Sequence, residues 1–255
     1  MLSGFLFKMA AAPFHLWAPD VYESTPAPIV AFLSVAPKLA ALYVVIHWMS
    51  IPWEGAIAVI ALFTIIVGTL AALNQTNSKR MMAWSSVAQA GFLLIIPATN
   101  LSPLVYYAVV FAIMNYVVFI VIHQQEQSGR GTSYSDFNGI GYTNPLAAVA
   151  ITLGLMSLVG IPPVAGFMTK LFVFSNAWSK YANSTSPIFL ALFIIGLLTT
   201  VASLFFYLKI PFYAFFRRSE EIQPLKISLV TNLLLIILVG TLLALFFAPG
   251  LLMAD

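Results

Sequence analysis

Cysteine and charged residues are what this sequence has least of. None of its 255 residues is cysteine, which excludes disulfides, thiolate-ligated iron–sulfur clusters and cysteine redox chemistry from the chain. Only 7% of residues are charged, the formal net charge is +3, and no basic patch with interleaved aromatics occurs, so we expect no nucleic-acid partner. Glycine-rich phosphate loops, metal-ligand spacings and nucleophile–base pairs are also missing. We therefore expect no metal site, no bound cofactor and no catalytic residue in this chain.

Hydrophobic residues, in contrast, make up 61% of the sequence. They form recurrent apolar runs of roughly 17–25 residues, long enough to cross a hydrocarbon core of about 30 Å as helices. The longest polar stretch, 124–144, is too short for a soluble domain, and its "SYSDF" predicts a short interfacial helix. The sequence predicts an all-α polytopic membrane protein with about eight transmembrane helices, at 2–17, 29–48, 56–73, 81–96, 104–122, 146–178, 188–216 and 227–251.

Basic residues in alternate loops predict the orientation of these helices, because cytoplasmic loops carry an excess of Lys and Arg. One side of the membrane has only Lys180, whereas the other has Lys79, Arg80, Arg130, Arg217, Arg218 and Lys226. We expect the second side to be cytoplasmic and both termini to lie on the non-cytoplasmic side. An outside N-terminus without a signal peptide is natural if an even number of spans precedes this chain.

The sixth apolar segment contains a stretch, "LVGIPPVAGFMTKL" at 158–171, that a continuous helix would not need. Pro162 and Pro163 remove amide donors and disturb the preceding turn, and Gly166 follows them. Carbonyl groups freed at membrane depth are tolerated only against protein or water. We therefore expect a discontinuous helix near 160–170, with a hydrated cavity beside the break.

Three lysines lie inside the apolar segments, where each costs on the order of 2.5–3.5 kcal/mol at the bilayer centre. Lys38 lies about ten residues into its segment, hence roughly 15 Å deep, Lys8 lies midway along the first run, and Lys170 follows the break. We expect these lysines to face a hydrated interior and to exchange protons. The alternative, in which the side chain snorkels to the headgroups, suits Lys209 better because it approaches the end of its segment.

His15 follows Lys8 by seven residues, so the two share a face if the helix continues past Pro13. It is a candidate partner in a proton relay, although a hydrogen-bonded core histidine is as reasonable. We expect Glu54 and Glu126 to lie in loops and to be solvated.

Two parts of the chain have a similar order of features: a lysine beside a proline break, a polar connection, and a helix with its own lysine. The polar connections read "YESTPAPI" and "NSTSPIF", and such repeats are typical of transporter folds. We predict the end of a first repeat at 1–50, a second repeat at 51–216 and a C-terminal transmembrane helix at 217–255.

Three motifs together resemble the antiporter-like membrane subunits of respiratory complex I, the proton-translocating NADH–quinone oxidoreductase. They are "FKMAAAPFHLWAPDVYESTPAPIVAFLSVAPKLA", "NQTNSKRMMAWSSVAQAGFLL" and "SLVGIPPVAGFMTKLFVF", in the order of the family. The resemblance covers essentially the whole chain, but only about the C-terminal half of the family's fourteen-helix subunit. The membrane glutamate that pairs with the lysine at position 8 is missing here, and Gln89 stands where many relatives have histidine.

The resemblance implies that protons are translocated while quinone is reduced in other subunits. It assigns Lys8 to the first broken helix, Lys38 to the centre of the next helix, and Lys170 to the second broken helix near the exit of the proton path. It also implies that NADH, FMN, iron–sulfur clusters and quinone belong to partner subunits. The expected partners are other membrane subunits, further antiporter-like ones included, within the lipid of a bacterial inner membrane.

Three other functions remain open on the sequence. A subunit of a multi-subunit sodium–proton antiporter would share the repeat and the lysines. A small-solute permease would need a cavity with convergent polar groups, whereas the sequence contains only isolated cations. The chain could also be a structural half-subunit that does not pump protons.

Overall fold

The computed structural model describes residues 2–48, 54–95, 101–217, 225 and 227–253. Within these ranges the chain is helical and forms no strand beyond one isolated bridge between Asn77 and Ser133, which confirms the predicted all-α class. The helices are α1 Leu2–Met9, α2 Trp17–Ser24, α3 Ala27–Trp48, α4 Glu54–Leu73, α5 Ser78–Leu93, α6 Leu101–Gln127, η1 Tyr134–Phe137, α7 Ile140–Thr143, α8 Pro145–Val159, α9 Gly166–Ser184, α10 Pro187–Tyr207, α11 Lys209–Phe216, α12 Leu229–Phe247 and η2 Pro249–Leu251.

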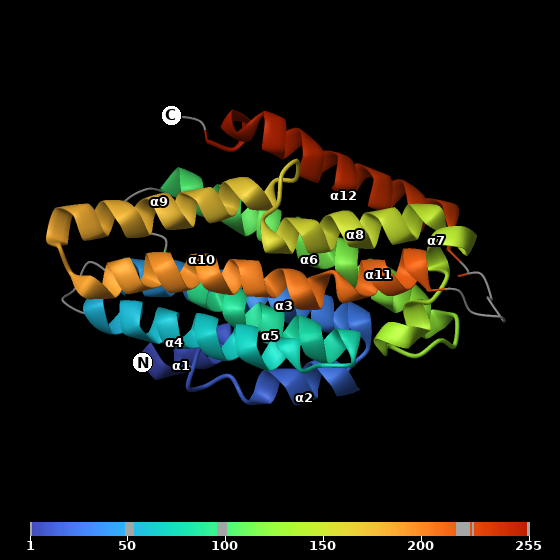
Figure 1. Ribbon diagram of the computed structural model, residues 1–255, viewed down its shortest axis with the longest axis horizontal. Helices are drawn as coiled ribbons and strands as arrows, with labels where there is room; N and C mark the ends of the chain where they lie inside the picture. The colour runs from blue at the N-terminus through green and yellow to red at the C-terminus, as the bar shows by residue number, and fades with distance from the viewer. Residues whose placement is uncertain (1, 49–53, 96–100, 218–224, 226, 254–255) are drawn as a thin grey trace.

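The long helices lie side by side along the long axis of the molecule (Figure 1). Five described segments are long and apolar enough to cross a membrane individually: Ala27–Val44, Glu54–Leu73, Pro103–Gln127, Pro187–Phe216 and Leu229–Phe247. The other expected spans are built from helices that are shorter, less apolar or interrupted. These are α5 and two discontinuous pairs, α8 with α9 and α1 with α2. Helix α2 begins at Trp17, so the first segment extends in helical form beyond the 2–17 that the sequence predicts.

The predicted break in the sixth segment is present between α8 and α9, at residues 160–165. Helix α8 ends at Val159, and the residue that caps it, Gly160, has a φ of 90°, which is left-handed and favours glycine. A second break, at residues 10–16, separates α1 from α2. Each break contains a cis X–Pro bond, Ala12–Pro13 in the first and Pro162–Pro163 in the second.

Helices α5 and α12 show how the bundle distributes polarity. Helix α5 contains two lysine or arginine residues, three serines and a glutamine, yet nearly all of its residues are buried, between α4, α2, α3 and α6. Helix α12 is almost entirely apolar, packs on one side of the bundle and is mostly exposed (Figure 1). Lipid solvates apolar side chains, so polar side chains concentrate in the interior of the bundle, where other helices satisfy them.

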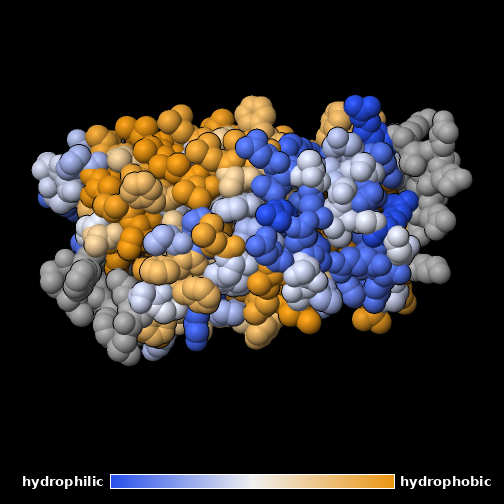
Figure 2. All heavy atoms as spheres, turned by 90° about the horizontal axis from the view of Figure 1, so that it is seen from below, coloured by the Kyte–Doolittle hydropathy of each residue, from blue (hydrophilic) through white to orange (hydrophobic). Residues whose placement is uncertain are grey.

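On the face of the molecule that is seen from below in Figure 2, one end is much more polar than the other. Figure 2 shows apolar atoms over one half of this face and hydrophilic atoms over the half where α2 lies. The "SYSDF" stretch forms η1 as predicted, and the carboxylate of Asp136 accepts the Ser133 amide N–H at 2.8 Å. The hydrophilic half fits the aqueous side of the membrane that the basic loops predict.

Candidate functional site

Lys38 lies in the interior, on α3, with 1% of its surface exposed. Its ammonium donates to the backbone carbonyl of Ser86 and, at 2.6 Å, to the Ser86 hydroxyl on α5. The hydroxyl of Tyr22, from α2, lies 3.2 Å from the same Ser86 oxygen. Three helices therefore converge on one buried cation, as is needed when a charge leaves water.

Lys170 is also buried, one turn into α9. Its ammonium lies 3.0 Å from the centroid of the Phe92 ring of α5, a cation–π contact. The stem of Lys170 packs on Gly160, where an added Cβ would lie 2.7 Å from Lys170 Cγ. The glycine that ends α8 thus also makes room for the lysine of α9.

The backbone groups at the second break have protein partners. The Gln89 amide donates to the Leu158 carbonyl at 2.9 Å, and the Gly166 amide donates to the Ser157 hydroxyl at 3.1 Å. The Ala165 amide donates to the Leu242 carbonyl of α12 at 3.0 Å. Side chains and a neighbouring helix therefore satisfy part of the backbone hydrogen bonding for which we expected the water of a hydrated cavity.

Lys8 and His15 do not form the pair that their spacing suggested. Helix α1 ends at Met9, and Ala10 has a φ of 55°, so the helical spacing does not extend to His15. Lys8 is exposed, whereas His15 is buried with its ring 5.5 Å from that of Trp84 on α5. The structure thus brings Lys38, Lys170 and His15 against α5 and leaves Lys8 away from it.

Two polar partners on α5 were not predicted from the sequence: Ser86, which binds Lys38, and Gln89, which bonds the Leu158 carbonyl at the second break. Ser86 and Gln89 are uncharged and lie in a segment that resembles an ordinary membrane span. Their spacing on α5 was an available signal, because Ser85 or Ser86, Gln89 and Phe92 recur at intervals of three or four residues on one helix face.

A second polar cluster lies where α2 meets α3, and it corrects one expectation. Glu126 is not a solvated loop residue but belongs to α6, and it forms an ion pair with Lys79 at 2.8 Å. Lys79 also donates to the Thr25 carbonyl at 2.6 Å, while Glu126 accepts the Ala27 amide at 3.0 Å. The pair thus caps the end of α2 and the beginning of α3 together.

Arg80, in the first turn of α5, lies beside this cluster and against the polar face of α2. It forms ion pairs with Glu23 at 2.6 Å and with Asp20 at 3.3 Å. The hydrogen bond that Arg80 donates to Glu23, followed by the charges of both carboxylates, raises the pKa of Arg80 above its usual value. Arg80 therefore stays a cation, which the prediction of membrane orientation from basic loop residues assumes.

Lys209 does not need to snorkel to the headgroups. Its ammonium donates to the Leu73 carbonyl, the last residue of α4, at 2.9 Å. A cation at a helix C-terminus satisfies a free carbonyl and the helix dipole, so Lys209 joins α10 and α11 to α4.

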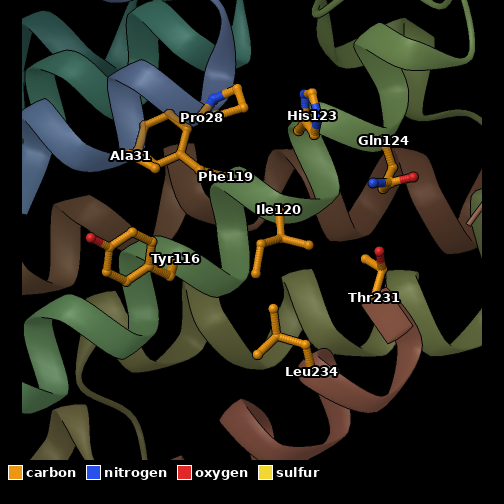
Figure 3. Close-up of a pocket in the computed structure, with 9 residues that line it drawn as sticks. All are labelled: Pro28, Ala31, Tyr116, Phe119, Ile120, His123, Gln124, Thr231 and Leu234. Carbon is orange, nitrogen blue, oxygen red and sulfur yellow. The ribbon is translucent and has the colours of Figure 1, made fainter. Parts of the chain in front are cut away.

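A groove of about 330 Å³ lies between α3, α6 and α12. Figure 3 shows that its walls are mostly apolar, with His123, Gln124 and Thr231 contributing polar groups. The residues that line it do not include Lys38 or Lys170. It has no set of convergent polar groups of the kind a solute permease needs.

Comparison with known proteins shows which family this chain matches. The family described as "NADH:quinone oxidoreductase/Mrp antiporter, TM" matches residues 1–199. A relative from Trichlorobacter lovleyi named NADH-quinone oxidoreductase subunit N is 40% identical, over 87% of this chain and 46% of its own length. One from Chloroherpeton thalassium, named NADH-quinone oxidoreductase subunit N 2, is 35% identical over 100% of this chain and 53% of its own. The chain thus spans about half the length of these curated relatives.

Solved structures show the same fold. A chain of the respiratory complex I from Thermus thermophilus with bound Aureothin superposes with a TM-score of 0.86 at 30% identity, covering 99% of this chain and 56% of that one. A chain of the Mrp complex from Dietzia sp. DQ12-45-1b superposes at 0.79 with 21% identity, over 99% and 56% of the two chains. The second likeness concerns the fold alone.

Proposed function

Because the chain belongs to the NADH:quinone oxidoreductase/Mrp antiporter transmembrane family, we propose that it is a membrane-arm subunit of an NADH–quinone oxidoreductase. In this role it translocates protons through a buried relay that includes Lys38 and Lys170. The observation that carries the proposal is the pair of buried lysines on two different helices, α3 and α9, both held against α5.

The two sites differ in how they hold a cation. Lys38 is bound by two oxygen atoms of Ser86, so a small displacement of α3 against α5 removes both acceptors at once. Lys170 rests on the aromatic face of Phe92 beside a helix break, a weaker contact than the two oxygen acceptors of Lys38. Relative movement of α3, α5 and α9 therefore changes which lysine best retains a proton, and alternation between the two moves protons along the bundle.

The redox chemistry belongs to other subunits in this proposal. NADH, FMN, iron–sulfur clusters and quinone bind elsewhere in the complex, and this chain contributes proton translocation. Its partners are other membrane subunits, including further antiporter-like subunits. The chain crosses a bacterial inner membrane with Lys79, Arg80 and Arg130 on the cytoplasmic side and both of its ends on the opposite side.

The test is substitution of each lysine in the assembled oxidoreductase, reconstituted into proteoliposomes. K38A and K170A are expected to lose most of the proton translocation and to slow quinone reduction, while subunit content stays normal. K180A is the matched control, because Lys180 forms its ion pair with Glu54 at the far end of the bundle. Translocation at the control level in both K38A and K170A would refute the relay.

A sodium–proton antiporter subunit is the second candidate, supported by the family description, which names both groups. The same proteoliposomes distinguish the two. Proton uptake driven by NADH oxidation without sodium supports the oxidoreductase, whereas proton movement that needs a sodium gradient supports the antiporter.

A further inference from the structure

The groove between α3, α6 and α12 has one polar end and otherwise apolar walls. Helices α3 and α12 both pack on α6, and the groove of about 330 Å³ runs between them. Its polar residues lie at helix ends: His123 and Gln124 near the end of α6, and Thr231 in the first turn of α12 (Figure 3). Farther along, Ile120 and Leu234 line it. The groove is therefore amphipathic along its length.

The Gln124 side chain at the polar end is buried but has no partner. Only 6% of its surface is exposed, and among the residues that the structure describes none hydrogen-bonds to its amide. Figure 3 shows this amide between His123 and Thr231, at the edge of the groove. A buried amide without a hydrogen bond costs free energy, whereas leucine would line the groove without that cost. The position therefore fits a ligand that supplies a hydrogen-bond acceptor.

The length of the groove matches one leaflet of a bilayer. Tyr116 and Gln124 both line it, and Tyr116 precedes Gln124 by eight residues on α6, which is about 12 Å of helix. One leaflet of the hydrocarbon core is about 15 Å thick, half of the full core. An extended acyl chain whose ester group lies at Gln124 therefore runs the length of the groove to Tyr116.

The charge of the groove selects the kind of lipid. Among the described residues that line it, none carries a permanent charge. The nearby ion pair of Lys79 with Glu126 is already bonded to the Thr25 carbonyl and the Ala27 amide. The carboxylate of a free fatty acid would need a cation at this place, whereas the neutral glycerol ester of a phospholipid needs only a donor.

We propose that this groove binds one phospholipid, with an acyl chain between α3 and α12 and a glycerol-ester oxygen that accepts a hydrogen bond from the Gln124 amide. The phosphate and the headgroup lie outside the groove, beyond His123 and Thr231. The lipid fills the space between α12 and α3, two helices that meet only through α6. Lys38 and Lys170 do not line the groove, so this site does not depend on the proton relay.

A second groove beside α12 provides a matched control. It measures about 260 Å³, lies between α8 and α12, and has only apolar side chains and a glycine among the described residues that line it. Ile236 lines this control groove and is 52% exposed, while Leu234 lines the proposed site and is 43% exposed. L234W and I236W therefore add the same ring to the same helix, and only L234W fills the proposed site.

The experiment measures the phospholipid that the full chain retains in mild detergent, by native mass spectrometry over a titration with palmitoyl-oleoyl phosphatidylethanolamine. The unsubstituted chain is expected to retain one molecule more than L234W, and I236W to match the unsubstituted chain. Q124L removes the amide at similar size and is expected to bind several-fold more weakly, because one hydrogen bond contributes up to about tenfold in affinity. Phosphatidylglycerol with the same acyl chains is expected to bind with similar affinity, since the headgroup lies outside.

The outcomes decide between this site and its rivals. Equal retention by L234W and the unsubstituted chain would overturn the site, and equal losses in L234W and I236W would show ordinary lipid around an exposed helix. If L234W does not fold, Q124L decides, and its binding at the unsubstituted level would overturn the proposal. A photoactivatable phosphatidylethanolamine that crosslinks to α6 in the isolated chain but not in the assembled oxidoreductase would show that a partner's helix occupies the groove instead. K38A and K170A are expected to retain the phospholipid, so failure of the relay and failure of this site are distinguishable.

Discussion

The two broken helices of this chain are alike in design and opposite in what they do with their lysine. In the first, Lys8 precedes the break and is exposed; in the second, Lys170 follows the break and is buried. The buried residues of α9 include Thr169, Lys170, Val173 and Ala177, so Lys170 lies on the stripe that faces the bundle. In α1 the buried residues are Leu6 and Met9, and Lys8 lies off that face.

A break with a lysine is therefore not enough to define a relay site. Whether the lysine is buried depends on which half of the broken helix carries it and on whether it lies on the face of that helix that packs against the bundle. The breaks themselves are closed in the same way, by a neighbouring helix: α4 offers the Thr64 hydroxyl to the Ala12 amide at 3.0 Å, and α12 offers the Leu242 carbonyl to the Ala165 amide.

The largest expected effect comes from filling the second break. A Cβ at Gly166 would overlap the carbonyl group of Ser157, which is backbone of α8. G166A forces α8 and α9 apart, and we expect a loss of at least about 3 kcal/mol, because overpacking against backbone has no cheap relief. The yield of folded, monodisperse chain in mild detergent and its thermal midpoint measure this loss.

Gly4, on the first broken helix, is the control for that substitution. Nothing lies within 4 Å of a Cβ added there, so G4A is expected to be neutral or to stabilise by up to about 1 kcal/mol. A G166A midpoint equal to that of G4A would show that the second break is loosely packed.

Next in size is the ion pair at the end of each broken helix. Glu126 pairs with Lys79, which is almost wholly buried, and caps α3. Glu54 pairs with Lys180 at the end of α9, but about half of its side chain is exposed. E126A leaves a buried cation and is expected to cost about 3 kcal/mol, the lower end of the range for a buried pair because Glu126 is itself partly exposed, whereas E54A is expected to cost about 1 kcal/mol or less.

Thermal midpoints of the two purified variants make this comparison. E126Q is the informative third variant, because its amide oxygen still accepts the Ala27 amide while the charge is lost. Equal midpoints for E126A and E54A would mean that the burial of Lys79 does not matter to stability.

The sequence predicts the break better than it predicts the contacts around it. Pro162 and Pro163 act locally on their own helix, so their effect is readable from the chain alone. The partners of Lys38 are not, because Ser86 lies 48 residues away and reaches it only through packing of α3 on α5. The sequence also predicts a loop at Glu126, because the neighbouring residues are polar. In the structure α6 extends to Gln127, and Glu126 pairs with Lys79 of α5, a contact between distant parts of the chain.

The smallest expected effect tests how each break holds its own two halves together. In the second, the buried Ser157 hydroxyl accepts a hydrogen bond from the Gly166 amide; in the first, the half-buried Trp17 indole donates to the Phe7 carbonyl at 3.1 Å. S157A leaves a buried amide without that acceptor and is expected to cost about 1–3 kcal/mol, whereas W17F, at a half-buried side chain, is expected to cost about 0.5–1.5 kcal/mol. Hydrogen exchange of the amides in α9 and α2 measures the two losses separately. If W17F loosens α2 more than S157A loosens α9, the first break depends on its own side chains more than the second does, and the likeness between the two breaks ends at their backbone shape.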